Sequence, residues 1–287
     1  MYHLKKVYLQ PREITMSYRA IALDLDGTLL TAKKTILPAS MEALALARQA
    51  GIKVLIVSGR HHSAIRPFYQ ALELDTPAIC CNGSYLYHYQ TKSASEGHPL
   101  TPEQAKGVLK KLQQFDIHGL MYADDQMLYE KPTGHVVRAL AWSDTLPADL
   151  RPNFRHVDNL EEETARAQQI WKFATHHPDN AHLNGFAQQV EEELGVTCEW
   201  SWKDQVDVAQ SGNSKGKLLR RWVEDQGLQM QDIVAFGDNF NDISMLSTVG
   251  LGVAMGNSAD AVKASADVVI GHNEEPGIAE LIRKRIL

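Results

Sequence analysis

The sequence predicts an α/β fold in which a parallel sheet is interrupted by an inserted α+β unit. Short apolar runs without polar alternation, at residues 20–23 and 52–57, are typical of strands that are buried on both faces. Stretches with the apolar spacing of helices separate these runs. Strand–helix–strand alternation at this spacing produces right-handed crossovers and a parallel sheet. Between residues 85 and 206 the pattern changes to alternating strands and hairpins, which indicates a separate antiparallel unit.

The first part of the parallel sheet is expected to alternate strands with helices. Gly51 marks the end of the first helix, because glycine readily takes the left-handed conformation that follows many helices. The expected strands cover residues 20–23, 52–57 and 78–81, and the expected helices cover residues 38–50 and 61–72.

The parallel pattern resumes near the C-terminus, after the inserted unit. Within that unit, strands are expected at 85–89, 119–122, 127–130, 170–175 and 197–202, with helices around 102–115 and 181–194. Beyond it, strands are expected at 233–236, 251–254 and 268–270, with helices over 215–226, 242–247, 260–266 and 278–285. We therefore predict a Rossmann-like core from residues 17–84 and 207–287, an inserted domain from 85–206, and a poorly packed extension at 1–16.

Composition excludes several classes of protein. The 287 residues are 44% hydrophobic and 22% charged, the balance of a folded chain with a sizeable core. A net charge of −6 argues against nucleic acid as a partner, and the longest apolar runs are too short to span a bilayer. The cysteines have no CxxC spacing, and residues 1–15 lack the apolar region of a secretory signal. The expected location is the cytoplasm.

Two carboxylates, Asp24 and Asp26, follow the first predicted strand. Residues i and i+2 of an extended segment point the same way, so both carboxylates would lie at the end of the sheet where open α/β proteins bind ligands. Two close carboxylates repel, which favours a retained proton or a bound cation. A solvated turn is the alternative interpretation. A calcium-binding loop is excluded because its twelfth position would be Thr35 rather than glutamate.

A second acidic segment, residues 237–242, follows another predicted strand in the same topological position. Oxygen ligands of this kind suit magnesium, and Asp238 is the favoured ligand. Asp242 is expected in the first turn of the next helix.

Two further segments have features of an anion site. Ser58 and Gly59, followed by Arg60, offer a hydroxyl and backbone N–H groups at a helix N-terminus. Lys215 is expected in the first turn of a helix, where its charge opposes the helix dipole. A phosphate-binding role explains that position better than a structural one.

Together these segments resemble, in order, the four motifs of the haloacid dehalogenase superfamily. The matching residues are 24–30, 57–60, Lys215 and 237–242. The segment 252–263 and the long insertion resemble the Cof-type branch of sugar and cofactor phosphatases, which carries a C2-type α/β cap. Segments at 60–62, 80–83, 118–122, 132–136 and 198–202 are similar to bacterial members of that branch that hydrolyse pyridoxal 5′-phosphate.

The resemblance implies a magnesium-dependent phosphomonoesterase that forms an aspartyl-phosphate. Asp24 would be the nucleophile, and Asp26 would protonate the leaving alcohol and then deprotonate water. Mg²⁺ would be bound by Asp24, the Asp26 carbonyl and Asp238. Asp26 also favours a phosphatase or phosphomutase over a dehalogenase, because a halide leaving group needs no proton. The phosphate oxygens would be bound by Leu25, Ser58, Gly59, Lys215 and Asn241.

The implied substrate is a small phosphorylated metabolite. Pyridoxal 5′-phosphate is expected, with sugar phosphates as the alternative within the same chemistry and a monomer or homodimer as the assembly. An alternative from another functional class is a phospho-acceptor or metabolite-sensing module, since receiver domains use a similar acidic cluster. In the cap, Trp200 and Trp202 are expected to pack in the core, although a tryptophan that faces the active site could stack on a pyridine ring. Lys172 is expected to be a solvated strand residue, with contact to a substrate carbonyl as the alternative.

Overall fold

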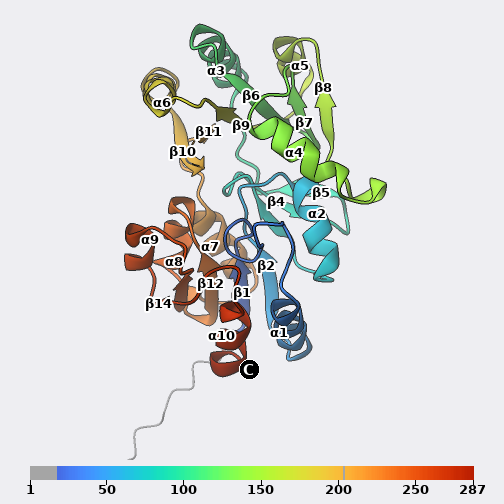
Figure 1. Cartoon of the computed structure of the whole chain (residues 1–287), viewed down its shortest axis with the longest axis vertical. Coiled ribbons are helices and arrows are strands. Elements are labelled where there is room, and N and C mark those ends of the chain that lie inside the picture. Colours follow the sequence, from blue (N-terminus) through green and yellow to red (C-terminus); the bar gives the residue numbers. More distant parts are fainter. Residues whose placement is uncertain (1–17, 203) are drawn as a thin grey trace, which may run out of the picture.

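The computed structural model describes residues 18–202 and 204–287. The predicted extension at residues 1–16 lies outside the described residues. In Figure 1 a parallel sheet and its helices occupy the lower part of the molecule, and a larger sheet with its own helices occupies the upper part.

The lower sheet is parallel, as the sequence predicts. Within the described residues it has the strand order β14-β13-β12-β1-β2. Its strands are β1 (Ala20–Leu23), β2 (Lys53–Ile56), β12 (Ile233–Gly237), β13 (Leu251–Ala254) and β14 (Val268–Val269). The accompanying helices are α1 (Pro38–Gln49), α2 (His62–Ala71), α7 (Lys215–Asp225), α8 (Ile243–Leu246), α9 (Asp260–Ala264) and α10 (Gly277–Arg285), with short 3₁₀ turns at Met230–Asp232 and Phe240–Asp242.

Helices cover both faces of this sheet, which explains the uninterrupted apolar runs of its strands. Ile21 and Leu23 of β1 belong to an apolar cluster that includes α1 and α10. Ala20 and Ala22 belong instead to a cluster that includes α7. Successive side chains of a strand point to opposite faces, so every residue of β1 is buried by one of the two helix layers.

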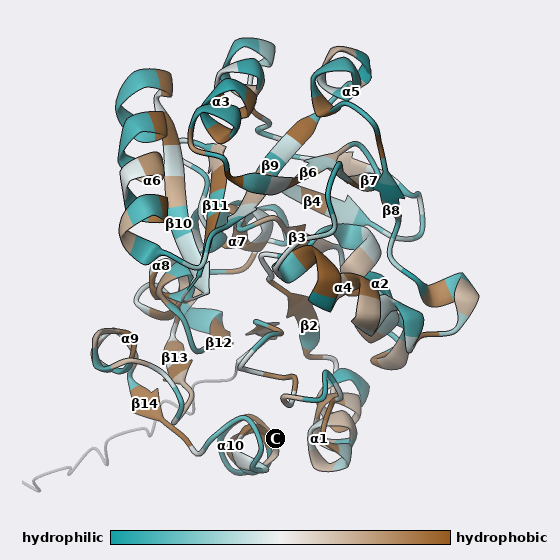
Figure 2. Ribbon diagram, turned by 45° about the horizontal axis from the view of Figure 1, so that its top comes forward, coloured by the Kyte–Doolittle hydropathy of each residue, from teal (hydrophilic) through white to brown (hydrophobic). Residues whose placement is uncertain are grey.

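The upper sheet is mainly antiparallel, with the strand order β10-β11-β9-β6-β7-β8. Its strands are β6 (His118–Ala123), β7 (Gln126–Tyr129), β8 (Phe154–His156), β9 (Ile170–His176), β10 (Val196–Trp202) and β11 (Gln205–Gln210). The helices around it are α3 (Pro102–Gln114), α4 (His135–Asp144), α5 (Leu160–Arg166) and α6 (Asn180–Leu194), with a 3₁₀ turn at Ala148–Leu150. Figure 2 shows hydrophilic outer surfaces on α3 and α6, whose apolar sides pack on the sheet.

The two faces of the upper sheet have different neighbours. Met121, Phe173 and Val208 lie on one face and share an apolar cluster with α3 and α6. Leu120 and Ala174 lie on the other face and join the cluster of the lower part. One face is therefore closed by helices, and the opposite face is turned toward the parallel sheet.

The predicted third parallel strand belongs to a different sheet. β3 (Ala78–Cys80) pairs antiparallel with β4 (Tyr85–His88), which pairs with β5 (Ser93–Ser95). Left-handed backbone at Cys81, Asn82 and Gly83 turns the chain back immediately after β3. A single bridge between Val57 and Ile79 joins this small sheet to the parallel one.

We propose the division into a core and an inserted cap on the basis of these sheets and clusters. The cap sheet continues to Gln210, because β11 pairs with both β9 and β10. The small sheet at 78–95 lies at the junction between the two parts.

Candidate active site

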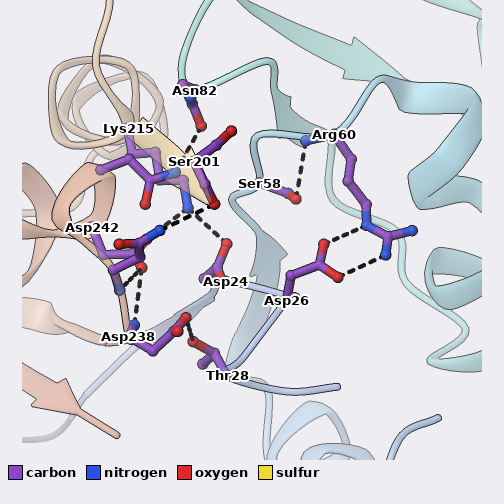
Figure 3. Close-up of polar contacts among 12 residues, drawn as sticks. Asp24, Asp26, Thr28, Ser58, Arg60, Asn82, Ser201, Lys215, Asp238 and Asp242 are labelled. Atoms are coloured by element: carbon purple, nitrogen blue, oxygen red, sulfur yellow. Dashed lines mark hydrogen bonds and ion pairs between the residues drawn. The ribbon is translucent and has the colours of Figure 1, made fainter. Parts of the chain in front are cut away.

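The carboxyl ends of three neighbouring parallel strands place polar side chains at one edge of the lower sheet. Asp24 follows β1, and its backbone N–H donates to the carbonyl of Phe236 in β12 at 3.1 Å. Asp238 follows β12 directly, and Ser58 lies just beyond β2. Figure 3 shows these residues facing one another. The parallel topology thus brings together residues that are more than 200 positions apart in the sequence.

Lys215 lies at the centre of this acidic edge. Its Nζ donates to Asp24 Oδ1 and to Asp242 Oδ1, each at 2.6 Å, and the residue is 1% exposed. Burial alone would disfavour the ammonium, but the two carboxylates raise the pKa of Lys215 above its ordinary value. The lysine is therefore a fixed positive charge beside the predicted nucleophile.

Asp24 is buried beside Lys215 and two further carboxylates. Burial raises the pKa of Asp24 well above its ordinary range, Lys215 lowers it, and the nearby carboxylates of Asp242 and Asp238 raise it. More negative than positive groups thus surround Asp24 at this point, so a further cation would stabilise its ionised form.

Asp242 organises the acidic segment that follows β12. Besides Lys215, its carboxylate accepts the backbone N–H groups of Asp238 and Asn239, at 2.9 and 3.0 Å. Asp242 is completely buried and occupies the first turns after the strand, as expected. The local turn is fixed by this one side chain.

Three carboxylates could hold a metal ion. In the part of the chain that the structure describes, one carboxylate oxygen each from Asp24, Asp238 and Asp242 lies within 4.8 Å of the others. Burial, followed by the charge of Asp242, raises the pKa of Asp238 to about 7, and the hydroxyl of Thr28 donates to its Oδ1 at 2.9 Å. An all-oxygen donor set with excess negative charge fits a hard divalent cation.

Gly27 permits the close approach of the two acidic segments. A Cβ atom there would lie 2.3 Å from Asp238 Oδ2, and the backbone of Gly27 has φ of +82°. Only glycine fits this position without strain.

Asp26 is held away from the carboxylate group by two cations that the sequence analysis did not pair with it. Arg60 donates to both Asp26 oxygens at 2.5 and 2.7 Å, and Lys34 donates at 2.6 Å. Burial would raise the pKa of Asp26, but Arg60 and then Lys34 lower it well below its ordinary value. The Asp26 side chain is therefore ionised in this arrangement. The Arg60 guanidinium also lies over the ring of Trp142 in α4, 4.6 Å from its centre, which ties this ion pair to the cap.

The predicted phosphate-binding residues lie near Asp24. Ser58 is buried, and its hydroxyl accepts the backbone N–H of Arg60 at 3.2 Å. Asn241 donates to Asn82 at 3.1 Å, and its own amide oxygen is buried with no hydrogen-bond partner among the described residues. Leu25, Gly59 and Asn241 follow three neighbouring strands of the parallel sheet, and Lys215 is the first residue of α7.

Asn82 is a residue of the site that sequence reasoning did not single out. A Cβ atom at Gly59 would lie 2.7 Å from Asn82 Oδ1, and Asn82 Nδ2 donates to Asp207 of the cap at 3.4 Å. The signal in the sequence is the Asn-Gly pair soon after β3, because such a pair marks a turn, and Asn82 has left-handed backbone with φ of 57°.

The expectation that Lys172 is solvated is wrong. Lys172 is 2% exposed, and its Nζ donates to Asp207 at 2.6 Å. It lies on the face of β9 that is turned toward the parallel sheet, so burial follows from strand alternation rather than from its own chemistry.

The two tryptophans of β10 have different environments. Trp200 packs against the cap core, as expected, whereas Trp202 is 59% exposed, so the expectation for Trp202 is wrong. The register shift between these residues in the pairing of β10 with β11 separates their orientations.

Comparisons with known proteins identify the family that the chain matches. A family model described as haloacid dehalogenase-like hydrolase matches residues 21–282. The chain is 57% identical over 272 residues to pyridoxal phosphate phosphatase YbhA of Escherichia coli, covering 95% of this chain and 100% of that protein. It is 30% identical to 5-amino-6-(5-phospho-D-ribitylamino)uracil phosphatase YitU of Bacillus subtilis, covering 92% and 96%.

Solved structures match the fold. A haloacid dehalogenase-like hydrolase from Bacteroides thetaiotaomicron superposes with a TM-score of 0.82 at 24% identity, covering 93% of this chain and 99% of that chain. A haloacid dehalogenase-like hydrolase from B. subtilis gives a TM-score of 0.81 at 22% identity, with the same coverage. Among the described helices, none is long and apolar enough to cross a membrane.

Proposed function

Because the chain belongs to the haloacid dehalogenase-like hydrolase family and is a phosphatase, we propose that it dephosphorylates pyridoxal 5′-phosphate with the help of Mg²⁺. The relative that is 57% identical over nearly its whole length carries that substrate in its name, and this observation supports the choice most strongly. Other relatives act on different phosphorylated small molecules, so sugar phosphates remain the alternative substrate class. The proposed setting is the cytoplasm.

The first step of the proposed reaction uses Asp24 as the nucleophile. A carboxylate oxygen of Asp24 attacks phosphorus, the bond between phosphorus and the ester oxygen breaks, and Asp26 gives its proton to the departing alcohol. In the second step Asp26 removes a proton from water, the resulting hydroxide attacks phosphorus, and the Asp24 carboxylate is released with inorganic phosphate. The two steps leave both side chains as they began.

Asp24, Asp238 and the backbone carbonyl of Asp26 are the proposed ligands of Mg²⁺, which when bound supplies positive charge beside the transferred phosphoryl group. Lys215 holds Asp24 in place through its 2.6 Å hydrogen bond and keeps its own charge through Asp242. The proposed contacts to the phosphoryl oxygens are the Lys215 ammonium, the Ser58 hydroxyl, the Asn241 amide and the backbone N–H groups of Leu25 and Gly59.

The pair between Asp26 and Arg60 must loosen for the first step. A carboxylate that accepts three hydrogen bonds from cations holds no proton to give. An incoming phosphate competes for the same cations, so substrate binding itself would weaken their hold on Asp26. The proposed acid then gains its proton only when substrate is present.

The test is phosphate release in the presence of Mg²⁺ from pyridoxal phosphate, erythrose 4-phosphate, glucose 6-phosphate and flavin mononucleotide. Asp24→Asn should abolish release from every substrate. Asp225→Asn, which changes an exposed carboxylate at the end of α7, is the matched control and should retain activity. A kcat/KM for pyridoxal phosphate that leads by about tenfold, equivalent to ~1.4 kcal/mol, supports the assignment.

Two other outcomes would redirect the proposal. Similar kcat/KM values for all substrates, still lost in Asp24→Asn, would favour a broad phosphatase over one for pyridoxal phosphate. A long-lived phosphoprotein without repeated turnover would favour the phospho-acceptor module instead.

A further inference from the structure

A polar cluster on the cap has no role in the mechanism above. It consists of Tyr122 on β6, Lys172 on β9, and Asp207 on β11, together with Glu199 on β10 and His135 at the start of α4. The register places Tyr122 opposite Lys172, and Glu199 opposite Asp207. Residues in direct register point to the same face, which is the face turned toward the parallel sheet.

This cluster is connected to the catalytic loops by direct contacts. Asp207 accepts a hydrogen bond from Asn82 at 3.4 Å, and Asn82 in turn accepts one from Asn241 at 3.1 Å. Ser201, two residues after Glu199, accepts at its carbonyl a hydrogen bond from Asn239 at 3.4 Å, and Figure 3 shows it among the residues of the acidic edge. The cap cluster therefore borders the atoms that would bind the phosphate.

Lys172 is incompletely hydrogen-bonded for a buried ammonium. An ammonium has three N–H donors. Among residues 18–202 and 204–287, the hydrogen bond from Nζ to Asp207 is the one that Lys172 makes, and its charge lies 4.7 Å from the centre of the Tyr122 ring. Buried donors without acceptors are costly, so an oxygen acceptor is expected at this point.

His135 adds a second incompletely bonded group. It is 8% exposed, and neither ring nitrogen has a hydrogen-bond partner in the described part of the chain. Burial lowers the pKa of His135 to about 4, so the ring is neutral at pH 7 and offers one donor and one acceptor. A buried cationic donor and a neighbouring buried imidazole thus have hydrogen-bonding capacity that the described residues leave unused.

We propose that Lys172 binds the aldehyde oxygen of the substrate and that Asp207, by keeping the lysine an ammonium, prevents it from condensing with that aldehyde. This inference rests on the proposed function, because it takes pyridoxal phosphate as the substrate. It names Lys172 and Asp207 as residues that determine specificity on the cap, with His135 beside them.

The chemistry gives Asp207 a definite task. A neutral amine attacks an aldehyde carbon through its lone pair, forms a carbon–nitrogen bond and, after loss of water, gives an imine. An ammonium has no lone pair and donates hydrogen bonds to the carbonyl oxygen instead. Although burial opposes the charge, Asp207 and the neighbouring Tyr122 raise the pKa of Lys172 above its ordinary value. The aldehyde is therefore held without being captured, and pyridoxal can leave.

The first experiment measures imine formation directly. Wild type and Asp207→Asn are incubated with pyridoxal phosphate near pH 8, reduced with borohydride, digested and examined by mass spectrometry. Borohydride supplies the hydride that converts an imine into a stable secondary amine. We expect labelling of Lys172 to rise about tenfold or more in Asp207→Asn, since a buried lysine without its anion loses its proton readily. Labelling of exposed Lys217 should stay the same in both proteins.

The second experiment measures selectivity. The ratio of kcat/KM for pyridoxal phosphate to kcat/KM for p-nitrophenyl phosphate, which has no aldehyde, is compared among wild type, Lys172→Met and Lys172→Arg. We expect about a tenfold fall in this ratio for Lys172→Met. The fall should be smaller for Lys172→Arg, which keeps a charged donor that cannot form an imine.

These outcomes separate the inference from the proposed function. A wild-type enzyme with no preference for pyridoxal phosphate contradicts the proposed function. A clear preference, combined with unchanged Lys172 labelling in a folded Asp207→Asn protein, contradicts the inference alone. If Asp207→Asn does not give a cooperative thermal transition, the Lys172 variants decide: equal losses in Lys172→Met and Lys172→Arg overturn the inference, and a smaller loss in Lys172→Arg supports it.

Discussion

Replacing Lys215 with methionine should destabilise the protein in a way that depends on pH. Lys215→Met keeps a chain of similar length but removes the charge that lies 2.6 Å from both Asp24 and Asp242. Both carboxylates are almost completely buried and cannot turn to solvent. Removing one partner of a buried ion pair typically costs about 3–5 kcal/mol, because the remaining charge is left without compensation. For a chain of this size that corresponds to a fall in Tm of roughly 6–20 °C.

The pH dependence follows from the direction of the Asp24 pKa. Burial already raises the pKa of Asp24 in the folded state, and loss of Lys215 removes the main influence that lowers it. A carboxyl group whose folded pKa exceeds its unfolded pKa binds more protons when folded, so stability falls as pH rises between those two values. The deficit of Lys215→Met relative to wild type should therefore be small near pH 4–5. It should widen by up to ~1.4 kcal/mol per pH unit for each proton involved.

Urea denaturation of both proteins in a metal-free buffer, at pH values from 5 to 8, measures this difference. Lys217→Met is the matched control, because Lys217 lies on the same helix, is exposed and donates to the backbone oxygen of Gly212. Its unfolding free energy should stay within about 0.5 kcal/mol of wild type at every pH. A deficit for Lys215→Met that is below ~1 kcal/mol, or that does not change with pH, would refute this electrostatic account.

Three further outcomes are expected. Gly216→Ala should lower the free energy of unfolding, measured by urea denaturation, by roughly 1–3 kcal/mol, because its Cβ would lie 2.0 Å from the backbone oxygen of Ser244. Gly185→Ala, where the nearest atom is 3.8 Å away, should be neutral or slightly stabilising, and equal effects of the two substitutions would contradict this prediction. A thiol reagent should modify at most Cys198 in the native protein and all three cysteines in denaturant, because Cys80 and Cys81 are buried. Rapid reaction of a second thiol in the native protein would contradict the burial of these two residues. Chelation should abolish phosphate release and lower Tm, and Mg²⁺ should restore both; full activity after chelation would exclude the proposed metal site.

The acidic edge of the parallel sheet was predictable from the sequence because it depends on topology. Once Asp24 and Asp238 are placed directly after parallel strands, their proximity follows from the rule that such strands end at one edge of the sheet. The position of Lys215 at the start of a helix was equally informative, because its charge there has no local explanation. The resemblance of these segments to one family then supplied the roles.

The partners of Asp26 and the environment of the cap were not predictable in the same way. Lys34 reaches Asp26 through a loop with left-handed backbone at Lys34 itself, and no periodic pattern reports such a loop. The sequence predicts a solvated Lys172 because a lysine is rarely buried without a partner, and its partner Asp207 lies 35 residues away on another strand. Strand alternation fixes which residues share a face but does not say which face will be covered.

Two buried lysines have proposed contacts with the substrate, and the number of their acidic partners separates their roles. Lys215 donates two of its three N–H groups to Asp24 and Asp242, which leaves one for a phosphoryl oxygen and makes the residue chiefly a positioning group. Lys172 donates one N–H group to Asp207, which leaves two for the part of the substrate outside its phosphate. A lysine held by two carboxylates cannot follow different ligands, whereas one held by a single carboxylate can adjust to them. Substitutions at Lys215 should therefore impair all substrates alike, and substitutions at Lys172 should change which substrate is preferred.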